Sequence, residues 1–243
     1  HFSLLFVPPA TAAEWGIKMI MNKINIAIDG PAGAGKSTVA KKVAARLGLM
    51  YIDTGAMYRA LTWKALQQGI DLTDEAELTG LAYSTEIDLS RSPGGSVSVR
   101  CDNRDVTEEI RSPEVSGSVS DLAKHPGVRK RMVELQQKMA VQGGVIMDGR
   151  DVGTHVLPDA GYKFFLTASL AERARRRWLE LQKAGHRVDI AELEAQISAR
   201  DKQDESRETA PLVVAPDAVV INTDGLNIEQ VADKICDICE SKE

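Results

Sequence analysis

Short apolar segments recur along the chain and are separated by stretches with helical periodicity. The apolar segments are residues 24–28, 49–52, 145–148, 162–166 and 218–221. Each has the length of a strand and few polar positions, which indicates burial on both faces. Between them, apolar residues recur every three or four positions in residues 39–48, 56–68, 74–83, 113–124, 126–141, 172–185, 190–199 and 227–239. This alternation predicts the α/β class, with a five-stranded parallel sheet covered by helices.

One region departs from the alternation of strand and helix. Residues 85–89 and 96–106 alternate polar and apolar positions, and the turn-forming sequence RSPGG at 91–95 separates them. This pattern predicts an antiparallel hairpin at about 84–110, carried on the main domain in a place that suits a lid or a specificity element.

Charge and composition narrow the range of partners. The 243 residues carry a net charge of −5 and have a pI near 5.5, which argues against nucleic acid or an anionic membrane as a partner. The apolar stretch 2–7 is too short to span a bilayer. We therefore expect small molecules as partners, and we also expect a cytoplasmic monomer. Residues 1–22, which begin with His1, are expected to be a disordered or artificial extension of a single domain over residues 23–243.

The three cysteines favour a reducing compartment over a disulfide framework. Cys236 and Cys239 form a C-x-x-C at the end of a helical pattern, and no second pair accompanies them. Packing on one helix face is therefore favoured over zinc or redox chemistry.

The strongest chemical signal is the loop between the first apolar segment and the first helical stretch. It reads Gly30, Pro31, Ala32, Gly33, Ala34, Gly35, Lys36, Ser37, Thr38, which satisfies G-x-x-x-x-G-K-[ST] in the strand-loop-helix context that the motif needs. Glycines let backbone N–H groups approach phosphate oxygens, and the start of the helix adds partial positive charge. Lys36 would reach the β and γ phosphates, and Ser37 would hold magnesium. A turn that binds nothing would not need Lys36 and Ser37 together. The loop predicts a nucleoside triphosphate site without naming the reaction.

Two further strand ends carry candidate residues. Asp148 closes the apolar run 145–147 and is predicted to lie beside the magnesium ion and to bind it through water; an ordinary turn carboxylate is the alternative. Residues 53–55 form a turn after the second strand, so that Thr54, Tyr58 and Arg59 would face the ligand crevice. Arg59 could equally be a solvated helix charge.

A basic stretch follows a predicted capping box formed by Ser169 and Glu172. Arg173 and Arg177 lie one turn apart on one helix face and suit a phosphoryl-transfer transition state, although a solvated face is the default explanation. The dense charged run 200–207 is likewise more typical of a solvated face.

Absent motifs exclude two classes of nucleotide-binding protein. The sequence holds no N-K-x-D that would read guanine and no L-S-G-G-Q of transport ATPases. The spacing of its motifs is that of a small kinase.

The motifs GPAGAGKST, DTGAMYR, EEIRSPEV, HPGVR, DGRDVGT, ERARRR and RDKQDESRETAPL occur in this order between about residues 23 and 239. In this respect the chain resembles the bacterial cytidylate kinases, and its β insert is similar to the insert of that family, a form that adenylate kinases lack. The resemblance implies a phosphate-loop NTPase fold with a core at 23–83 and 145–243, an acceptor-binding insert at about 84–124 and a helical lid at about 177–207.

The resemblance also implies an activity: phosphorylation of CMP and dCMP by ATP with Mg²⁺, through direct in-line transfer. It places Ser120, Arg129 and Asp151 at the cytosine, Arg59, Arg150 and Arg207 at the acceptor phosphate, Arg200 and Asp204 at the sugar, and Thr54 also at the substrate. Lys36, Arg150, Arg173 and Arg177 would be catalytic. A carboxylate such as Asp151 can accept the amino group of cytosine but not the carbonyl of uracil, so CMP should be preferred to UMP. A phosphate-loop kinase of another small acceptor and a non-catalytic nucleotide-dependent switch remain as alternatives.

Overall fold

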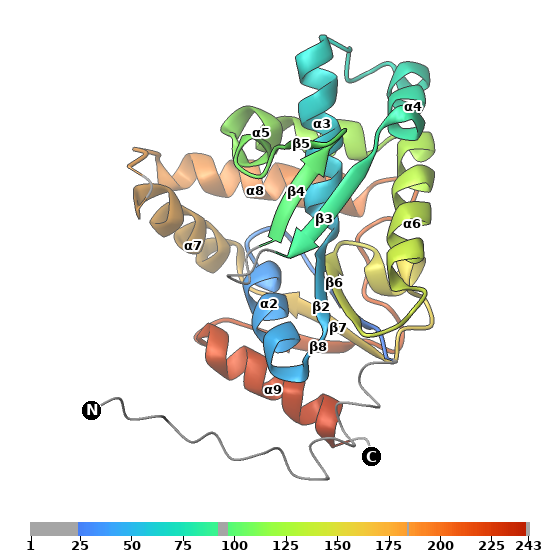
Figure 1. The fold of residues 1–243 in the computed structure, drawn as a ribbon. Helices are drawn as coiled ribbons and strands as arrows, with labels where there is room; N and C mark the ends of the chain where they lie inside the picture. The colour runs from blue at the N-terminus through green and yellow to red at the C-terminus, as the bar shows by residue number, and fades with distance from the viewer. Residues whose placement is uncertain (1–23, 92–96, 184, 242–243) are drawn as a thin grey trace, which may run out of the picture.

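The computed structural model describes residues 24–91, 97–183 and 185–241. The predicted extension at 1–22 and most of the predicted turn at 91–95 lie outside the described residues. The central sheet is parallel, with strand order β2-β6-β1-β7-β8, which confirms the predicted α/β class (Figure 1). Its strands are β1 Ile26–Asp29, β2 Met50–Asp53, β6 Val145–Gly149, β7 Tyr162–Thr167 and β8 Val219–Asn222.

The register aligns the strand ends that carry polar residues. Asp29 pairs with Gly149, and Asp53 pairs with Asp148. The carboxyl ends of β1, β2 and β6 therefore meet at one edge of the sheet, which is where open α/β sheets bind ligands.

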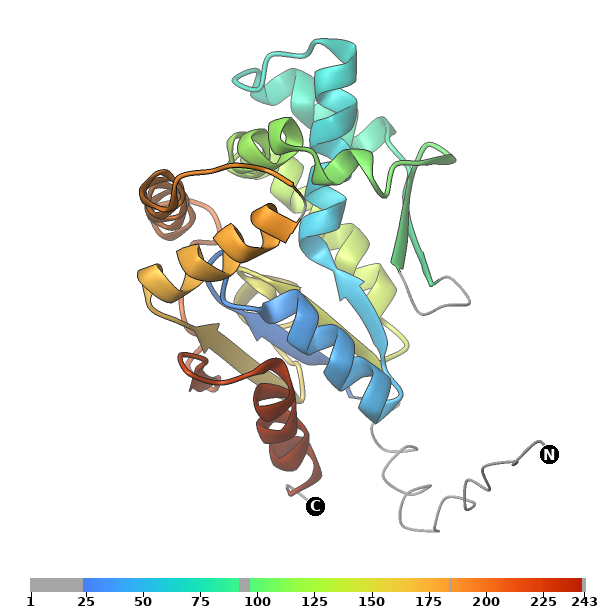
Figure 2. The same cartoon turned by 90° about the vertical axis from the view of Figure 1, so that its left-hand side faces the viewer.

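Alternate residues of the strands face opposite helical layers. Ile26 and Ile28 pack with α2 (Lys36–Leu47) and α9 (Ile228–Glu240), which lie side by side on one face (Figure 2). Ala27 faces the other side, where α6 (Pro126–Ala140) and the π-helical turn η2 (Val152–Val156) cover it.

A second apolar cluster lies beyond the end of the sheet. It joins α3 Thr54–Gln68, α4 Glu75–Ser84, the 3₁₀ turn η1 Glu109–Arg111, α5 Pro113–Ala123 and α6 to strands β3 Ile87–Arg91 and β4 Val97–Cys101. Strand β4 pairs antiparallel with β3 and with the exposed short strand β5 Arg104–Asp105. The predicted antiparallel pairing is thus present, with a short third strand. Asp102 and Asn103 adopt positive φ angles of 47° and 66° in the tight turn that leads to this strand.

Helices α7 (Leu170–Lys183) and α8 (Ile190–Glu205) pack on each other through Ala174, Leu193 and Ile197. Helix α8 continues beyond the predicted end at residue 199 and includes much of the charged run. In the part of the chain that the structure describes, no helix has the length and apolar character needed to cross a membrane.

The predicted capping box at the start of α7 is only half formed. The Glu172 amide donates to Ser169 Oγ at 3.3 Å, but the Ser169 amide donates to Asp224 instead of to Glu172. The Glu172 carboxylate is occupied by Arg175 and Arg176, both at 2.8 Å, and these stronger charged partners displace the box.

Candidate active site

The glycine-rich loop connects β1 to α2 at the ligand edge of the sheet. Gly30 has φ +144°, and a Cβ there would lie 2.0 Å from the Leu166 carbonyl oxygen, so only glycine fits. The Lys36 ammonium is buried and donates to the Pro31 carbonyl at 2.8 Å. Burial, together with the nearby Arg150, lowers the pKa of Lys36 well below its ordinary value. A triphosphate would offer this buried cation the negative partners that favour its charged form.

Ser37 and Asp148 meet at the first turn of α2. The Ser37 hydroxyl donates to Asp148 Oδ2 at 2.8 Å, and the Tyr51 hydroxyl donates to Asp148 Oδ1 at 2.6 Å. Burial, reinforced by Asp53, raises the pKa of Asp148. Asp148 is therefore not an ordinary turn carboxylate.

The donor atoms of this pair fit a magnesium ion. Ser37 and Asp148 offer hard oxygen ligands, and the described residues hold no cluster of three or more His, Cys, Asp or Glu side chains that could bind a metal alone. Mg²⁺ commonly takes one or two protein ligands and completes its shell with water and phosphate oxygens. The arrangement suits metal that arrives with a nucleotide.

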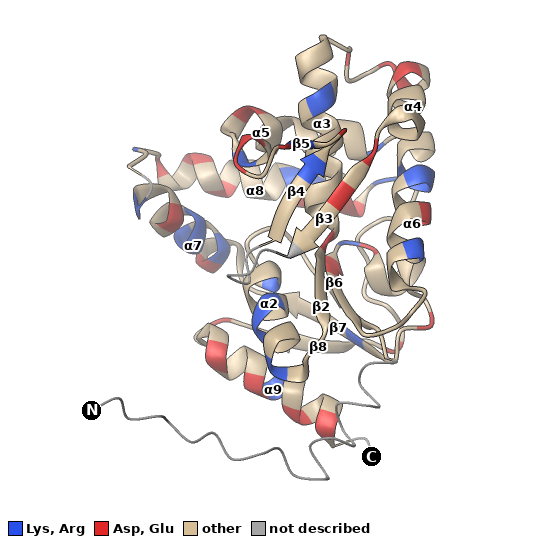
Figure 3. Cartoon of the chain, viewed as in Figure 1, with Lys and Arg blue, Asp and Glu red and all other residues tan. Residues whose placement is uncertain are grey.

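One of the two candidate arginines on α7 contacts the phosphate loop. The Arg173 guanidinium is buried and donates to the Ala32 carbonyl at 3.0 Å and to Asp201 at 2.6 Å. Arg177 lies at the surface and pairs with Glu180 at 3.1 Å. Figure 3 shows the basic residues gathered along this helix. The structure therefore brings Arg173, but not Arg177, into contact with the loop.

A buried ion pair joins α6 to the segment after β6. Arg129 on α6 pairs with Asp151 in the segment after β6, and Arg129 also donates to the Ala123 carbonyl at 3.1 Å. The Arg129 guanidinium lies 5.5 Å from the centroid of the Tyr58 ring. Ser120 is half-buried on α5.

The charged run at 200–207 is folded into the same region. Asp204 is 4% exposed; Arg150 Nε lies 2.8 Å from its carboxylate and Arg207 Nη1 3.8 Å from it. Burial and the charge of Arg150 lower the pKa of Arg200 to about 10. The run therefore has two sides: Lys202, Glu205 and Ser206 are exposed as a solvated face would be, whereas Asp204 is buried and faces the site.

Several buried polar atoms at this site have no hydrogen-bond partner within the described chain. They are Tyr58 Oη, Arg129 Nε, Arg200 Nε, Asp201 Oδ1 and Arg207 Nη2. Unpaired buried polar atoms are costly and rare, so a cluster of them, most of them on arginines, indicates a place that an anionic polar ligand fills.

Helix α3, which follows the second strand, carries two of the predicted site residues. Arg59 pairs with Asp53 at 3.0 Å and is partly buried, which favours the crevice over a solvated helix face. The Thr54 hydroxyl is buried and donates to the Asp148 carbonyl at 2.7 Å, so it holds the β6 strand end.

Tyr51, Asp201 and Asp29 also belong to the site, and motif reasoning did not find them. The Asp29 carboxylate is 4% exposed and accepts hydrogen bonds from the amides of Val152 at 2.8 Å and Gly153 at 2.7 Å. Burial raises the pKa of Asp29 to about 6. The only signal in the sequence was the position of Asp29, directly before the first glycine of the loop.

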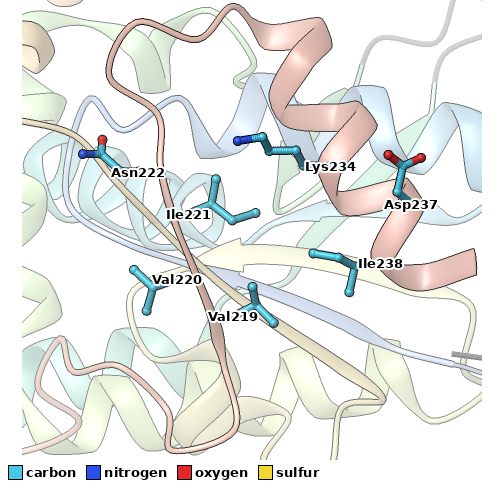
Figure 4. Close-up of a pocket in the computed structure, with 7 residues that line it drawn as sticks. All are labelled: Val219, Val220, Ile221, Asn222, Lys234, Asp237 and Ile238. Atoms are coloured by element: carbon cyan, nitrogen blue, oxygen red, sulfur yellow. The ribbon is translucent and has the colours of Figure 1, made fainter. Parts of the chain in front are cut away.

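A surface groove lies elsewhere, along the outer sheet strand β8 and helix α9 (Figure 4). It is lined by Val219, Val220, Ile221, Asn222, Lys234, Asp237 and Ile238. Its walls are mostly aliphatic and contain none of the site residues described above.

Together, the parallel sheet, the glycine-rich loop with its buried lysine, the Ser37–Asp148 pair and the arginine cluster define a phosphate-loop kinase. Residues 26–241 match the family model described as "Cytidylate kinase", and the chain belongs to this family. The resemblance seen in the motifs is thereby confirmed, and the family is one of phosphotransferases.

Curated relatives agree over nearly the whole chain. A protein of Desulfitobacterium hafniense named cytidylate kinase is 57% identical over 219 residues, which cover 90% of this chain and 94% of the relative. A Bacillus velezensis protein of the same name is 56% identical over 90% of this chain and 98% of its own length. Among solved structures, a shikimate kinase from Acinetobacter baumannii is similar with a TM-score of 0.49 and 16% identity, covering 93% of this chain and 98% of that one.

Proposed function

We propose that this protein transfers the γ-phosphoryl group of ATP, bound with Mg²⁺, to the phosphate of CMP and dCMP. The observation that carries the proposal is the set of buried nitrogens on Arg129, Arg200 and Arg207 that have no hydrogen-bond partner in the described chain, with Arg200 close enough to Lys36 of the phosphate loop to affect its charge. The two sides of the site are close enough for Arg150, Asp148 and Arg200 to act on the charge of Lys36. Relatives that are more than half identical bear the name cytidylate kinase.

The Arg129–Asp151 pair supports a role in recognising cytosine. Arg129 holds Asp151 Oδ2, which leaves the other carboxylate oxygen to accept the exocyclic amino group of cytosine. Uracil presents a carbonyl there and would leave a buried carboxylate opposite an acceptor, which is costly. Ser120, on the neighbouring helix, would contact the same base.

The remaining acceptor residues would hold the phosphate and the sugar. Arg59, Arg150 and Arg207 would bind the monophosphate, and they must exchange their present carboxylate partners for it. Arg200 and Asp204 would contact the ribose. A missing 2′-hydroxyl removes only part of these contacts, which accounts for dCMP as a second substrate.

Transfer would proceed by attack of an acceptor phosphate oxygen on the γ-phosphorus while the bond to the leaving ADP oxygen breaks. The acceptor monoester is already ionised at neutral pH, so no side chain needs to remove a proton. Ser37 and Asp148 would hold a magnesium ion, which would help to neutralise the charge of the phosphates. Lys36, Arg150 and Arg173 would stabilise the charge on the moving group, and Arg177 would join them only after leaving Glu180.

Closure of the β insert and of the lid at about 177–207 would exclude water from the transfer. Competing hydrolysis of ATP should then be slow without an acceptor. We further propose that the enzyme acts as a cytoplasmic monomer; its cysteine usage supports a reducing compartment. Sedimentation equilibrium would test the monomer.

The deciding experiment measures ADP release from magnesium ATP with CMP, dCMP, UMP, AMP and GMP offered one at a time. We expect strong turnover with CMP and dCMP, weak turnover with UMP and none with the purine nucleotides. Turnover with a different acceptor would support the kinase assignment and contradict the assignment of a cytosine site. ATP binding without any acceptor-dependent turnover would favour a nucleotide-dependent switch.

A further inference from the structure

The segment that carries Arg150 and Asp151 is held from outside the acceptor site. After Gly149 the chain passes through these two residues and enters the π-helical turn η2. The first amides of that turn, from Val152 and Gly153, donate to the two carboxylate oxygens of Asp29 at 2.8 and 2.7 Å. Asp29 closes strand β1 and directly precedes Gly30 of the phosphate loop.

We infer that Asp29 is a positioning residue that fixes Asp151 and Arg150 for the acceptor nucleotide and couples them to the phosphate loop. The inference rests on the proposed function, since it assigns Asp29 to the same acceptor site. Asp29 contacts neither substrate directly; it acts through the backbone that follows Asp151. The Asp151 carbonyl accepts hydrogen bonds from the amides of His155 at 2.9 Å and Val156 at 3.2 Å. The turn is therefore fixed at the Asp151 carbonyl as well as at the two amides that follow it.

Packing around the contact leaves little room for an alternative path of the chain. A Cβ at Gly149 would come 2.7 Å from Thr54 Oγ1, and a Cβ at Gly153 would come 3.3 Å from Asp29 Oδ2 and 3.2 Å from Lys163 Cδ. The backbone therefore runs close to Asp29 at Gly153 and close to Thr54 at Gly149. Two charge-assisted hydrogen bonds from one carboxylate define both the position and the orientation of the turn.

The test variant is Asp29→Asn. Asparagine has nearly the same shape but only one acceptor oxygen, so its amide N–H₂ must face either the Val152 or the Gly153 amide. We expect the KM for CMP to rise about tenfold or more and the preference for CMP over UMP to fall about fivefold or more, because a loosened Asp151 reads the base less well. The dissociation constant of ATP should change by less than about threefold, since the loop glycines and Lys36 remain.

Two further variants provide a second test of the inference and a control. Gly153→Ala leaves the Asp29 charge in place but pushes on the same contact, and we expect it to weaken CMP in the same direction by a smaller factor. Asp71→Asn is the matched control: this exposed carboxylate also accepts two local bonds, from the amide and hydroxyl of Thr73, and its loss should leave both substrates unaffected.

Hydrogen exchange separates this inference from the proposed function. Amide exchange of residues 149–156 should be faster in Asp29→Asn than in the parent protein, whichever acceptor the enzyme uses. Unchanged exchange there, an unchanged ratio of CMP to UMP, or an equal loss of affinity for ATP and CMP would overturn the role of Asp29. A parent enzyme that prefers another acceptor would refute the proposed function alone, and the Asp29 variants must then lose affinity for that acceptor.

Discussion

Replacing Asp151 by asparagine tests the base-reading pair at the centre of the acceptor site. The side chains of Arg129 and Asp151 are 3% and 9% exposed, so the guanidinium depends on this carboxylate for its charge compensation. Removing one partner of a buried ion pair costs about 3–5 kcal/mol, and asparagine retains one acceptor oxygen, so we expect a loss of about 1–3 kcal/mol in the free energy of unfolding.

The larger effect concerns the choice between bases. A hydrogen bond to a charged group contributes about 1.5–3 kcal/mol, which corresponds to about ten- to hundredfold in the ratio of kcat/KM for CMP to that for UMP. Asparagine can rotate its amide to donate to the uracil carbonyl, so the ratio should fall by a factor in this range. Most of the fall should come from poorer use of CMP.

The assay is a coupled measurement of ADP release over a range of CMP and UMP concentrations at saturating magnesium ATP. Urea unfolding of each variant shows that the protein measured is folded, and Asp71→Asn serves as the carboxylate control. A ratio that stays within threefold of the parent value in a folded variant with normal ATP binding would refute the role of Asp151.

Four further predictions follow from particular contacts. Lys36→Ala should lower kcat by about a hundredfold or more, measured as ADP release with CMP; a loss of less than tenfold would contradict the phosphate-loop assignment. Asn227→Ala removes the observed capping box of α9 and should lower the free energy of unfolding by about 1 kcal/mol in urea titrations. Asp29 has its pKa raised from 3.8 to about 6, so its contribution to stability is present below pH 3.8 and is lost as the pH rises through 6. The free energy of unfolding of the parent should therefore fall relative to that of Asp29→Asn by up to about 3 kcal/mol between pH 4 and pH 7, as measured by urea unfolding of both proteins at both pH values. Cys101 is buried with its pKa raised to about 11, so its thiol should react with Ellman's reagent at pH 8 only at the rate of unfolding.

The sequence predicts those parts of the structure that depend on residues close together in the chain. All five strands of the central sheet were predicted to within two residues, because each is a short apolar run between turn signals. The phosphate loop was predicted in the same way, since its conformation requires glycines at fixed offsets. The antiparallel pairing of β3 and β4 also followed from local alternation.

The contacts that single motifs could not reveal join distant segments. Tyr51 reaches Asp148, Arg173 reaches Asp201, and Asp29 reaches the amides after Asp151. The two members of each pair lie far apart in the sequence and are not spaced by a helical or strand repeat. Sequence periodicity therefore gives no sign that they meet. They became visible only when the sheet register brought the strand ends together.

Arg173 and Arg177 show a different limit. They lie on the same face of α7 by spacing, yet Arg173 is buried against the phosphate loop and Arg177 is exposed. Helical periodicity gives the direction of a side chain but not how far along the helix its neighbours extend. Arg173 is buried because the phosphate loop and α8 cover the helix there, and Arg177 is exposed because they do not reach it.

The central position of β1 has a consequence for how the chain folds. Ile26 pairs with Ile146 on one side and with Tyr162 on the other. The first strand therefore cannot form its sheet hydrogen bonds until segments much later in the chain have been synthesised. The second apolar cluster, from Ala56 to Met132, is contiguous in the chain and can collapse while β1 is still unpaired. Closing the long loop across that cluster costs entropy before any sheet contact forms, which makes assembly of the sheet the slow step. During synthesis the two backbone edges of β1 stay unpaired until β6 and β7 have emerged, and in that interval the chain is most exposed to aggregation.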